Sequence, residues 1–298
     1  MADNVLIFND GTGVVIGTIT SRNDGDSSNA ILTNKLLGLS HTTDTNCICV
    51  DIGAAQGWWT ALATKCGYTT LSFEPDASGA ALFKQNMLDN NLASKIILME
   101  CAISDKTCIQ TMRTCGESSY LGKHASESNT EETFIEKQIT TMRFEEIFNG
   151  TIIPFLDATI HIPLMKIDTE GHEPGVIDGM ISMLEAGRIH NIITEFTTYW
   201  YGETREIAIV ESEALMRKIA AYLPYIYILS RRGSILYFGP IKASHYKHIC
   251  SMLYDRHLQV DVAFLSKPID ASYGLTVIDI DKTDLRKECG LDASDKVE

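Results

Sequence analysis

The chain has 298 residues, of which 45% are hydrophobic and 21% are charged. This composition is typical of a globular protein with a sizeable core, and it excludes a disordered or fibrous chain. Lys and Arg number 25 against 39 Asp and Glu, which gives a net charge of −14. A polyanion would be repelled on average, so we expect no nucleic-acid partner.

The sequence contains no apolar run close to the ~20 residues that span a bilayer, and its first residues lack the basic flank of a secretory signal. We therefore expect a cytoplasmic protein without a membrane span. The eight cysteines include no Cys-x-x-Cys pair, unlike most metal sites and disulfide frameworks. We expect reduced thiols, with Cys47 and Cys49 packing as small apolar side chains.

Residues 1–46 are expected to form an N-terminal extension. Two β-rich segments surround Asn9-Asp10-Gly11 within residues 5–20, which predicts a β-hairpin. Residues 22–29 are polar and contain Gly and Ser, so we predict a loop there.

From residue 47 onward, short apolar segments alternate with segments of helical pattern. The pattern predicts strands at 47–52, 70–73, 95–101, 137–142, 164–168, 189–196 and 260–265, and a hairpin of 225–229 with 235–238. It predicts helices at 58–66, 78–90, 144–148, 174–186 and 206–222, and a long polar loop at 117–132. Such alternation favours an α/β domain with a mainly parallel sheet, here over 47–268, followed by a polar tail over 269–298.

A glycine-spaced turn follows the strand that ends in Asp51. Gly53 and Gly57 are spaced as Gly-x-x-x-Gly, which argues against a dinucleotide, whose pyrophosphate favours Gly-x-Gly-x-x-Gly. Glu74 ends the next predicted strand about 20 residues further on, where an acidic side chain can accept both ribose hydroxyls. A third strand end at 100–105 could meet an adenine. The arrangement favours an adenosine-type ligand, and we expect S-adenosylmethionine.

The segment from Lys166 to Glu173, Lys-Ile-Asp-Thr-Glu-Gly-His-Glu, resembles the Lys-Ile-Asp-x-Glu-Gly-x-Glu signature of FkbM-type methyltransferases. Further resemblances follow in order at 50–57, 73–75, 102–105, 118–119, 142–147 and 194–196, so that the likeness covers roughly residues 47–267. It implies a Rossmann-like class I methyltransferase fold, with a mainly parallel seven-stranded sheet and helices on both faces. It also implies methylation of a hydroxyl on a sugar, glycan or related small metabolite.

The cofactor residues expected from the strand ends and the resemblance are Asp51, Gly53, Ala54, Gly57, Trp58, Glu74, Pro75, Ala102, Ile103 and Asp168. Asp168, Glu170 and His172 are the predicted catalytic residues, because ligands bind beyond the carboxyl ends of parallel strands. A positioned carboxylate or imidazole there could remove the proton of an alcohol. Glu173 precedes Pro174, and we expect it to cap the following helix.

The acceptor is expected to contact Ser119, Glu195, Tyr199 and Trp200. The Ser119 assignment rests on the resemblance, and the aromatic side chains can either pack against a sugar or plug the core. Asp168, Glu170 and Glu195 could instead hold a divalent metal ion, Mg or Mn, that acidifies the hydroxyl, although we favour a metal-free site.

Two other readings remain open. A methyltransferase that acts on nitrogen often carries an Asn/Asp-Pro-Pro-Tyr-type loop after the fourth strand, and this loop is absent here. A non-catalytic Rossmann-like module that binds an adenosine ligand, or a partner scaffold, is disfavoured by Asp51, Gly53, Gly57 and Glu74 but not excluded.

Overall fold

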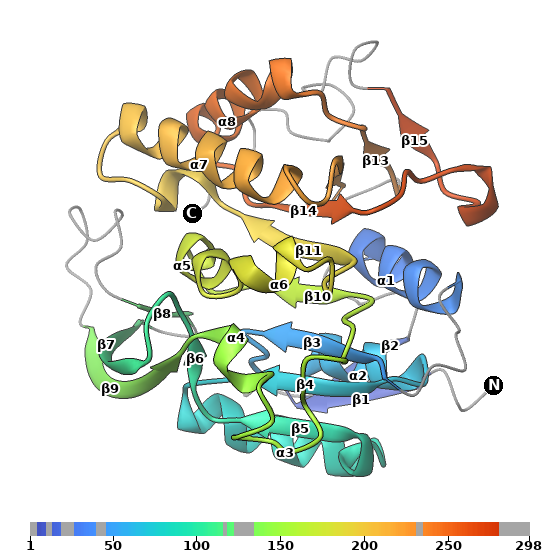
Figure 1. Cartoon of the computed structure of the whole chain (residues 1–298), viewed down its shortest axis with the longest axis vertical. Helices are drawn as coiled ribbons and strands as arrows, with labels where there is room; N and C mark the ends of the chain where they lie inside the picture. The colour runs from blue at the N-terminus through green and yellow to red at the C-terminus, as the bar shows by residue number, and fades with distance from the viewer. Residues whose placement is uncertain are drawn as a thin grey trace.

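The computed structural model describes residues 5–9, 14–18, 27–39, 46–115, 118–121, 134–230 and 235–279. Through these residues runs a nine-stranded sheet in the order β15-β13-β12-β14-β11-β10-β3-β4-β5 (Figure 1). Its strands are β3 (Ile48–Ile52), β4 (Thr69–Phe73), β5 (Ile96–Met99), β10 (Met165–Ile167), β11 (Asn191–Phe196), β12 (Tyr225–Leu229), β13 (Tyr237–Phe238), β14 (Val260–Leu265) and β15 (Val277–Ile278).

The sheet is parallel from β11 through β10, β3 and β4 to β5, and β14 lies antiparallel between β11 and β12. Parallel neighbours need long crossover connections, which helices supply. The predicted α/β fold with a mainly parallel sheet is therefore confirmed. The sheet has nine strands where seven were expected, because the two-residue strands β13 and β15 add an edge beyond β12.

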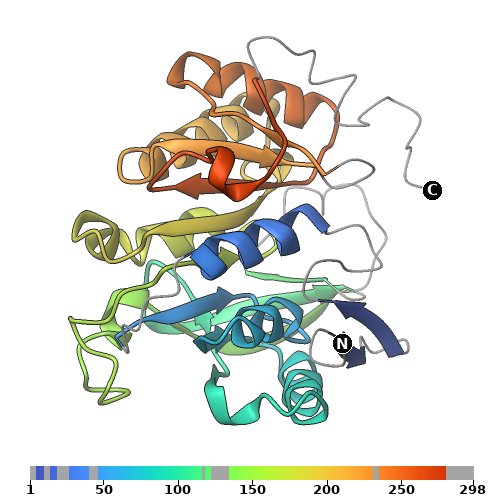
Figure 2. The same cartoon turned by 90° about the vertical axis from the view of Figure 1, so that its right-hand side faces the viewer.

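Helices cover both faces of the sheet (Figures 1 and 2). They are α1 (Ser27–Leu39), α2 (Trp58–Lys65), α3 (Ala77–Asp89), α4 (Phe144–Ile147), α5 (Glu173–Asp178), α6 (Ile181–Glu185), α7 (Arg205–Ala220) and α8 (Tyr246–Asp255), with short 3-10 turns η2 (Ala93–Lys95), η4 (Thr198–Trp200), η5 (Ala243–His245) and η6 (Ala271–Tyr273).

Two apolar cores lie on opposite faces of the sheet, because alternate side chains of a strand point in opposite directions. In β3, Val50 and Ile52 belong to the core shared with α4 to α8, whereas Cys49 belongs to the core shared with α1 and α2. Cys49 is fully buried and Cys47 packs partly buried against the same core. Both thiols therefore pack as small apolar side chains, as predicted.

The predicted N-terminal hairpin is confirmed, because β1 (Val5–Asn9) pairs antiparallel with β2 (Val14–Thr18). Leu6 of β1 is buried against Phe83 and Met87 of α3. The expected turn residues Asp10 and Gly11 lie outside the described residues.

The predicted loop at 22–29 is wrong at its end, because Ser27–Asn29 form the first turn of α1. Ser28 and Asn29 are polar but buried, and their side chains bond Ser230 and Asp261 far along the chain. These hydrogen-bond partners are distant in the sequence. The polar residues therefore suggest an exposed loop, although tertiary contacts bury them in a helix. Residues 19–26 lie outside the described part of the chain.

The single helix expected over 174–186 is also wrong, since α5 ends at Asp178 and α6 begins at Ile181. Gly179 lies between them, and a Cβ atom there would sit 2.1 Å from the carbonyl oxygen of Ser104. The helix is interrupted at Gly179 because the backbone there passes close to Ser104, the residue that follows β6.

A second, four-stranded sheet has the order β6-β9-β7-β8 (Figure 1). Its strands are β6 (Ala102–Ile103), β7 (Cys108–Cys115), β8 (Ser118–Leu121) and β9 (Ile135–Met142). The predicted loop over 117–132 is therefore wrong at 118–121, and residues 122–133 lie outside the description. The antiparallel β7–β9 pair curls over one end of the central sheet.

The tail expected after residue 268 contributes η6 and β15, and β15 pairs with β13; its residues 280–298 are not described. In the residues that the structure places, no helix combines the length and apolar character needed to cross a membrane.

Candidate functional site

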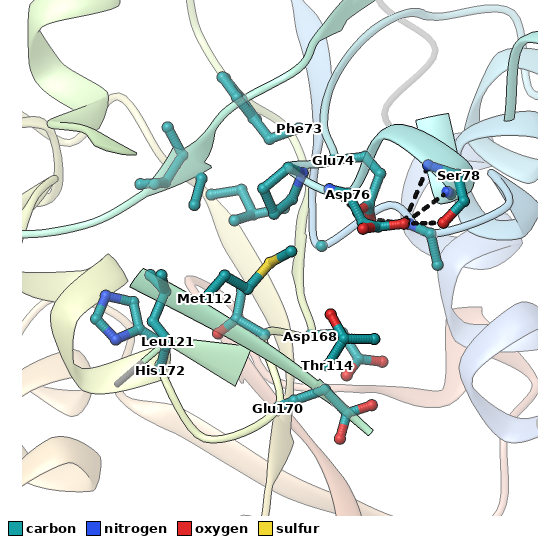
Figure 3. Close-up of a pocket in the computed structure, with 18 of the residues that line it drawn as sticks. Phe73, Glu74, Asp76, Ser78, Met112, Thr114, Leu121, Asp168, Glu170 and His172 are labelled. Atoms are coloured by element: carbon teal, nitrogen blue, oxygen red, sulfur yellow. Dashed lines mark hydrogen bonds between the residues drawn. The ribbon is translucent and has the colours of Figure 1, made fainter. Parts of the chain in front are cut away.

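A cavity of about 330 Å³ opens at the carboxyl ends of β3, β4 and β10 (Figure 3). The predicted site residues that line it are Gly53, Glu74, Pro75, Ala102, Ile103, Asp168, Glu170 and His172. Side chains of β7 and β8 close another side. The fold thus brings together residues from five segments that lie far apart in the sequence.

Gly53 allows the ends of β3 and β10 to meet. Its φ is +79°, and a Cβ atom would lie 1.8 Å from the carbonyl oxygen of Asp168. The amide of Asp168 donates to the carbonyl of Ile52 (2.9 Å), and the amide of Gly53 donates to that of Phe73 (3.0 Å). A side chain at position 53 would therefore force the strand ends apart and obstruct the cavity.

Glu74 lies at the end of β4 with its carboxylate held by backbone amides. Its Oε2 accepts from Ala55 (2.8 Å) and its Oε1 from Asp76 (2.7 Å). Burial raises the pKa of Glu74 from 4.5 to about 7, although the two amides act in the opposite direction. A carboxylate has about four acceptor sites, so this one can accept further hydrogen bonds from a ligand.

Asp76 joins the cavity wall to the second sheet. Its Oδ2 accepts from the amides of Ser78 (3.0 Å) and Gly79 (3.2 Å) and so caps α3, while its Oδ1 pairs with Lys137 of β9. Burial raises the pKa of Asp76, but hydrogen bonds from Lys137 and Ser78 outweigh it and lower the pKa to about 2. A charged contact therefore ties β9 to the cavity.

The loop after β10 is held in a tight turn by Glu173. Glu170 has a φ of +52° and Gly171 one of +96°. The Oε1 atom of Glu173 accepts from the amide (2.8 Å) and hydroxyl (2.9 Å) of Thr169 and from the amide of Gly171 (3.4 Å). The expected helix cap is wrong, because Glu173 is the first residue of α5 and His172 occupies the N-cap position. The Glu173 carboxylate holds the preceding loop instead.

Asp168 and Glu170 lie on one side of the cavity, and His172 lies on the other (Figure 3). The predicted catalytic residues therefore line one cavity without forming a single cluster. Asp168 pairs with Lys166, whose Nζ lies 3.3 Å from Oδ2.

His172 is held by a short chain of hydrogen bonds. Its Nε2 lies 3.0 Å from the hydroxyl of Ser104, which donates to Oδ1 of Asp105 (3.1 Å). Because the hydroxyl has one proton, it must accept from His172, which places the imidazole proton on Nε2 and leaves Nδ1 as an acceptor. Burial lowers the pKa of His172, against the opposing effect of Asp105, so the ring is neutral near pH 7.

Four other predicted cofactor residues lie behind the cavity wall. Asp51 is buried and accepts from Thr60 of α2 at 2.6 Å, and burial raises its pKa to about 6. Ala54 and Trp58 pack in the small core with α3, and the space beside Gly57 is filled by Phe83 and Met87. These residues shape the turn from the inside and do not line the cavity.

Three of the predicted acceptor residues, Glu195, Tyr199 and Trp200, do not line the cavity. Glu195 is the penultimate residue of β11 and is buried. Tyr199 and Trp200 pack edge to face in η4 with ring centroids 5.7 Å apart, and Tyr199 also meets the ring of His257. Ser119 lies in β8, and its side chain is outside the described part of the structure. Within the described residues, no group of three or more His, Cys, Asp or Glu side chains is arranged to hold a metal ion, including the set Asp168, Glu170 and Glu195.

The sequence did not lead us to several residues that line the cavity: Ile52, Ala55, Gln56, Phe73, Asp76, Ser78, Gly79, Leu82, Met112, Thr114, Leu121 and Thr169. Asp76 carries a readable signal, since Asp before a helical segment is a common N-cap. No such sequence signal marks Met112, Thr114 and Leu121. They reach the cavity because β7 pairs with β8 and β9, and this pairing is not evident from the local sequence.

Comparisons with solved structures give low overall similarity. The methyltransferase FkbM from Methylobacillus flagellatus KT is 16% identical, with a TM-score of 0.41, over 78% of this chain and 47% of that one. This chain therefore spans less than half of that protein. The SAM-dependent methyltransferase from Agrobacterium tumefaciens is 8% identical, with a TM-score of 0.44, over 89% of this chain and 71% of that one. The O-methyltransferase TomG from Streptomyces achromogenes is 9% identical, with a TM-score of 0.41, over 80% and 81%.

No match was found among curated proteins. The family profile described as "Methyltransferase FkbM domain", in contrast, matches residues 51–235, which is more than half of the chain. The matched range contains the glycine turn, Glu74 and the loop from Asp168 to Glu173. This protein belongs to the FkbM family of S-adenosylmethionine-dependent methyltransferases.

Proposed function

We propose that this protein methylates a hydroxyl group of a sugar, glycan or related small metabolite. The observation that carries the proposal is that the cavity beside Glu74 is also lined by three proton acceptors, Asp168, Glu170 and His172. An alcohol is a poor nucleophile until its proton is removed, and a positioned base contributes typically ~10²–10⁴-fold. A neutral amine already carries the lone pair it needs, so an array of bases favours an oxygen acceptor.

The cavity fits S-adenosylmethionine as its cofactor. The absence of a side chain at Gly53 lets its backbone approach that of Asp168, so both residues line the cavity. Burial raises the pKa of Glu74 to about 7, and hydroxyl donors of a ribose would satisfy its remaining acceptor sites. The volume of about 330 Å³ lies within the ~300–1,000 Å³ of small-molecule sites.

S-adenosylmethionine, when bound, supplies an electrophilic methyl group. Glu74 would hold the ribose, and Pro75, Ala102 and Ile103 would flank the adenine. We assign Asp168 and Glu170 to the acceptor and methyl-donor side of the cavity.

His172 is the base that we favour, without a metal ion. Its Nδ1 is the acceptor atom of a neutral ring. A proton taken at Nδ1 would stay there, and the positive charge of the ring would be stabilised by Asp105 through the Ser104 hydroxyl that accepts from Nε2. The carboxylates of Asp168 or Glu170 are the alternative bases. The net charge of −14 supports a small acceptor over a nucleic acid.

The test is to incubate the protein with S-adenosylmethionine and a panel of mono- and oligosaccharides, and to follow the mass of each acceptor. We expect one or more acceptors to gain the mass of one methylene, with S-adenosylhomocysteine formed in equal amount. The alternative function, a non-catalytic module, predicts that the protein binds S-adenosylmethionine with no product from any acceptor. The absence of binding would reject both functions.

A further inference from the structure

A buried ammonium group connects the cavity to a carboxylate behind it. The Nζ atom of Lys166 on β10 lies 3.3 Å from Oδ2 of Asp168 and 3.0 Å from Oδ1 of Asp261 on β14. The side chain of Lys166 is 7% exposed, that of Asp261 is 2% exposed and that of Asp168 is 35% exposed. Two carboxylates therefore share one cation, and Asp168, unlike Asp261, lines the cavity.

Asp261 is fixed from its other side by α1. Its Oδ2 accepts from Nδ2 of Asn29 (3.1 Å), and Oδ1 of Asn29 accepts from the hydroxyl of Thr33 (3.3 Å), which in turn accepts from Nε1 of Trp59 (3.1 Å). All of these groups are buried. Because Asn29 is uncharged, its hydrogen bond does not neutralise the charge of Asp261. Asn29 and Asp261 both lie outside the range that matches the family.

Carboxylates outnumber ammonium groups at this position. Asp51 is a third carboxylate close enough to interact electrostatically with both Lys166 and Asp168. Lys166 lies closer to the more deeply buried Asp261, where a charge pair interacts more strongly than it does near solvent. Lys166 thus neutralises the negative charge of Asp168 only in part, and the remaining negative charge lies at the cavity wall.

We infer that Asp261 acts through Lys166 as a positioning and specificity residue, which keeps Asp168 negative so that the cavity binds a cationic ligand more tightly than its neutral counterpart. The inference rests on the proposed function, because S-adenosylmethionine carries a positive sulfonium that S-adenosylhomocysteine lacks. Preference for the charged donor over the spent product limits product inhibition. Asp261 itself touches neither ligand.

The experiment measures the dissociation constants of S-adenosylmethionine and S-adenosylhomocysteine by titration calorimetry for wild type and Asp261→Asn. Asparagine keeps the shape of the side chain but releases Lys166 to neutralise Asp168. We expect the preference for S-adenosylmethionine to fall about tenfold, the size of partial loss of one nearby charge at an effective dielectric of ~20, while affinity for S-adenosylhomocysteine stays close to wild type. Equal weakening of both ligands would show a merely structural role and overturn the inference.

Two further variants complete the design. Lys166→Gln/Asp261→Asn removes both buried charges together, which proteins often tolerate. It also removes the ammonium group that pairs with Asp168 among the residues that the structure describes. Its preference should equal or exceed that of wild type, and a reduced preference contradicts the inference even if Asp261→Asn alone does not fold. Asp255→Asn removes an exposed carboxylate that pairs with Arg205 and should change neither constant. If wild type binds neither ligand, it is the proposed function that fails.

Discussion

A Cβ atom at Gly175 would lie 2.6 Å from Nε2 of His172, so the imidazole rests directly on the first turn of α5. The same nitrogen lies 3.0 Å from the hydroxyl of Ser104. Gly175 therefore leaves the space that lets His172 reach its partner. Its role is to position the proposed base, since Gly175 does not line the cavity.

Gly175→Ala should displace the imidazole and reduce kcat at least about tenfold, because general-base catalysis depends on placement of the acceptor atom. Affinity for S-adenosylmethionine should stay near wild type. Steady-state kinetics and calorimetry measure the two effects. Gly38→Ala is the matched control, since nothing lies within 4 Å of its added Cβ. Unchanged kcat in Gly175→Ala would count against His172 as the base.

His172→Ala should lower kcat by ~10²-fold with little change in cofactor affinity, since a positioned base contributes typically ~10²–10⁴-fold. Glu170→Gln tests the carboxylate alternative in the same assay. If only Glu170→Gln is slow, the proton is taken on the other side of the cavity.

Chelation distinguishes a metal-free mechanism from a metal-dependent one. EDTA should leave a metal-free enzyme at full rate and should stop a metal-dependent one until Mg or Mn is restored.

Glu74→Ala should weaken binding of S-adenosylmethionine by ~1.5–3 kcal/mol, the range for a hydrogen bond to a charged group. The physical reason is that the variant lacks the carboxylate that would accept hydrogen bonds from the ribose hydroxyls. Titration calorimetry at pH 8, where the group is ionised, gives the value directly. An unchanged dissociation constant would show that the ribose lies elsewhere.

The stability of the ligand-free protein should fall as pH rises from about 4.5 to 7. Burial holds the pKa of Glu74 at about 7 in the folded chain against 4.5 for the free group. The folded state therefore binds a proton that the unfolded state releases in this window, which amounts to about 3 kcal/mol lost by pH 7.

Urea unfolding at a series of pH values tests this prediction, with Glu74→Gln as the comparison. The variant should lose less stability over the same window. Some slope should remain in the variant, because burial also raises the pKa of Asp51 to about 6. Identical pH profiles for the two proteins would show that Glu74 does not titrate there.

The part of the cavity wall formed by the strand ends could be predicted because it depends on local sequence. Strands that end in Asp or Glu, with a glycine turn after the first, place Gly53, Glu74 and Asp168 at one sheet edge whatever the rest of the chain does. Helix α8 is absent from the predicted elements, although its buried residues have the helical spacing i, i+3, i+4 and i+7: Tyr246, Ile249, Cys250 and Leu253.

The remainder depends on contacts between distant segments. Asp51 lies near the end of β3, where a cofactor ligand is expected, yet its carboxylate is buried and accepts a hydrogen bond from Thr60 at 2.6 Å. Ser104 holds His172 across a gap of 68 positions, and Asn29 holds Asp261 across 232. Nothing in the local sequence distinguishes these polar residues from solvent-exposed ones.

The most direct test of the central claim is ¹³C NMR of the product made with S-adenosylmethionine labelled in its methyl carbon. The account predicts a single methoxy resonance on the acceptor with wild type, and its loss with Glu74→Ala at limiting cofactor. A labelled methyl group on nitrogen, or a methoxy signal that forms equally well without Glu74, would contradict it.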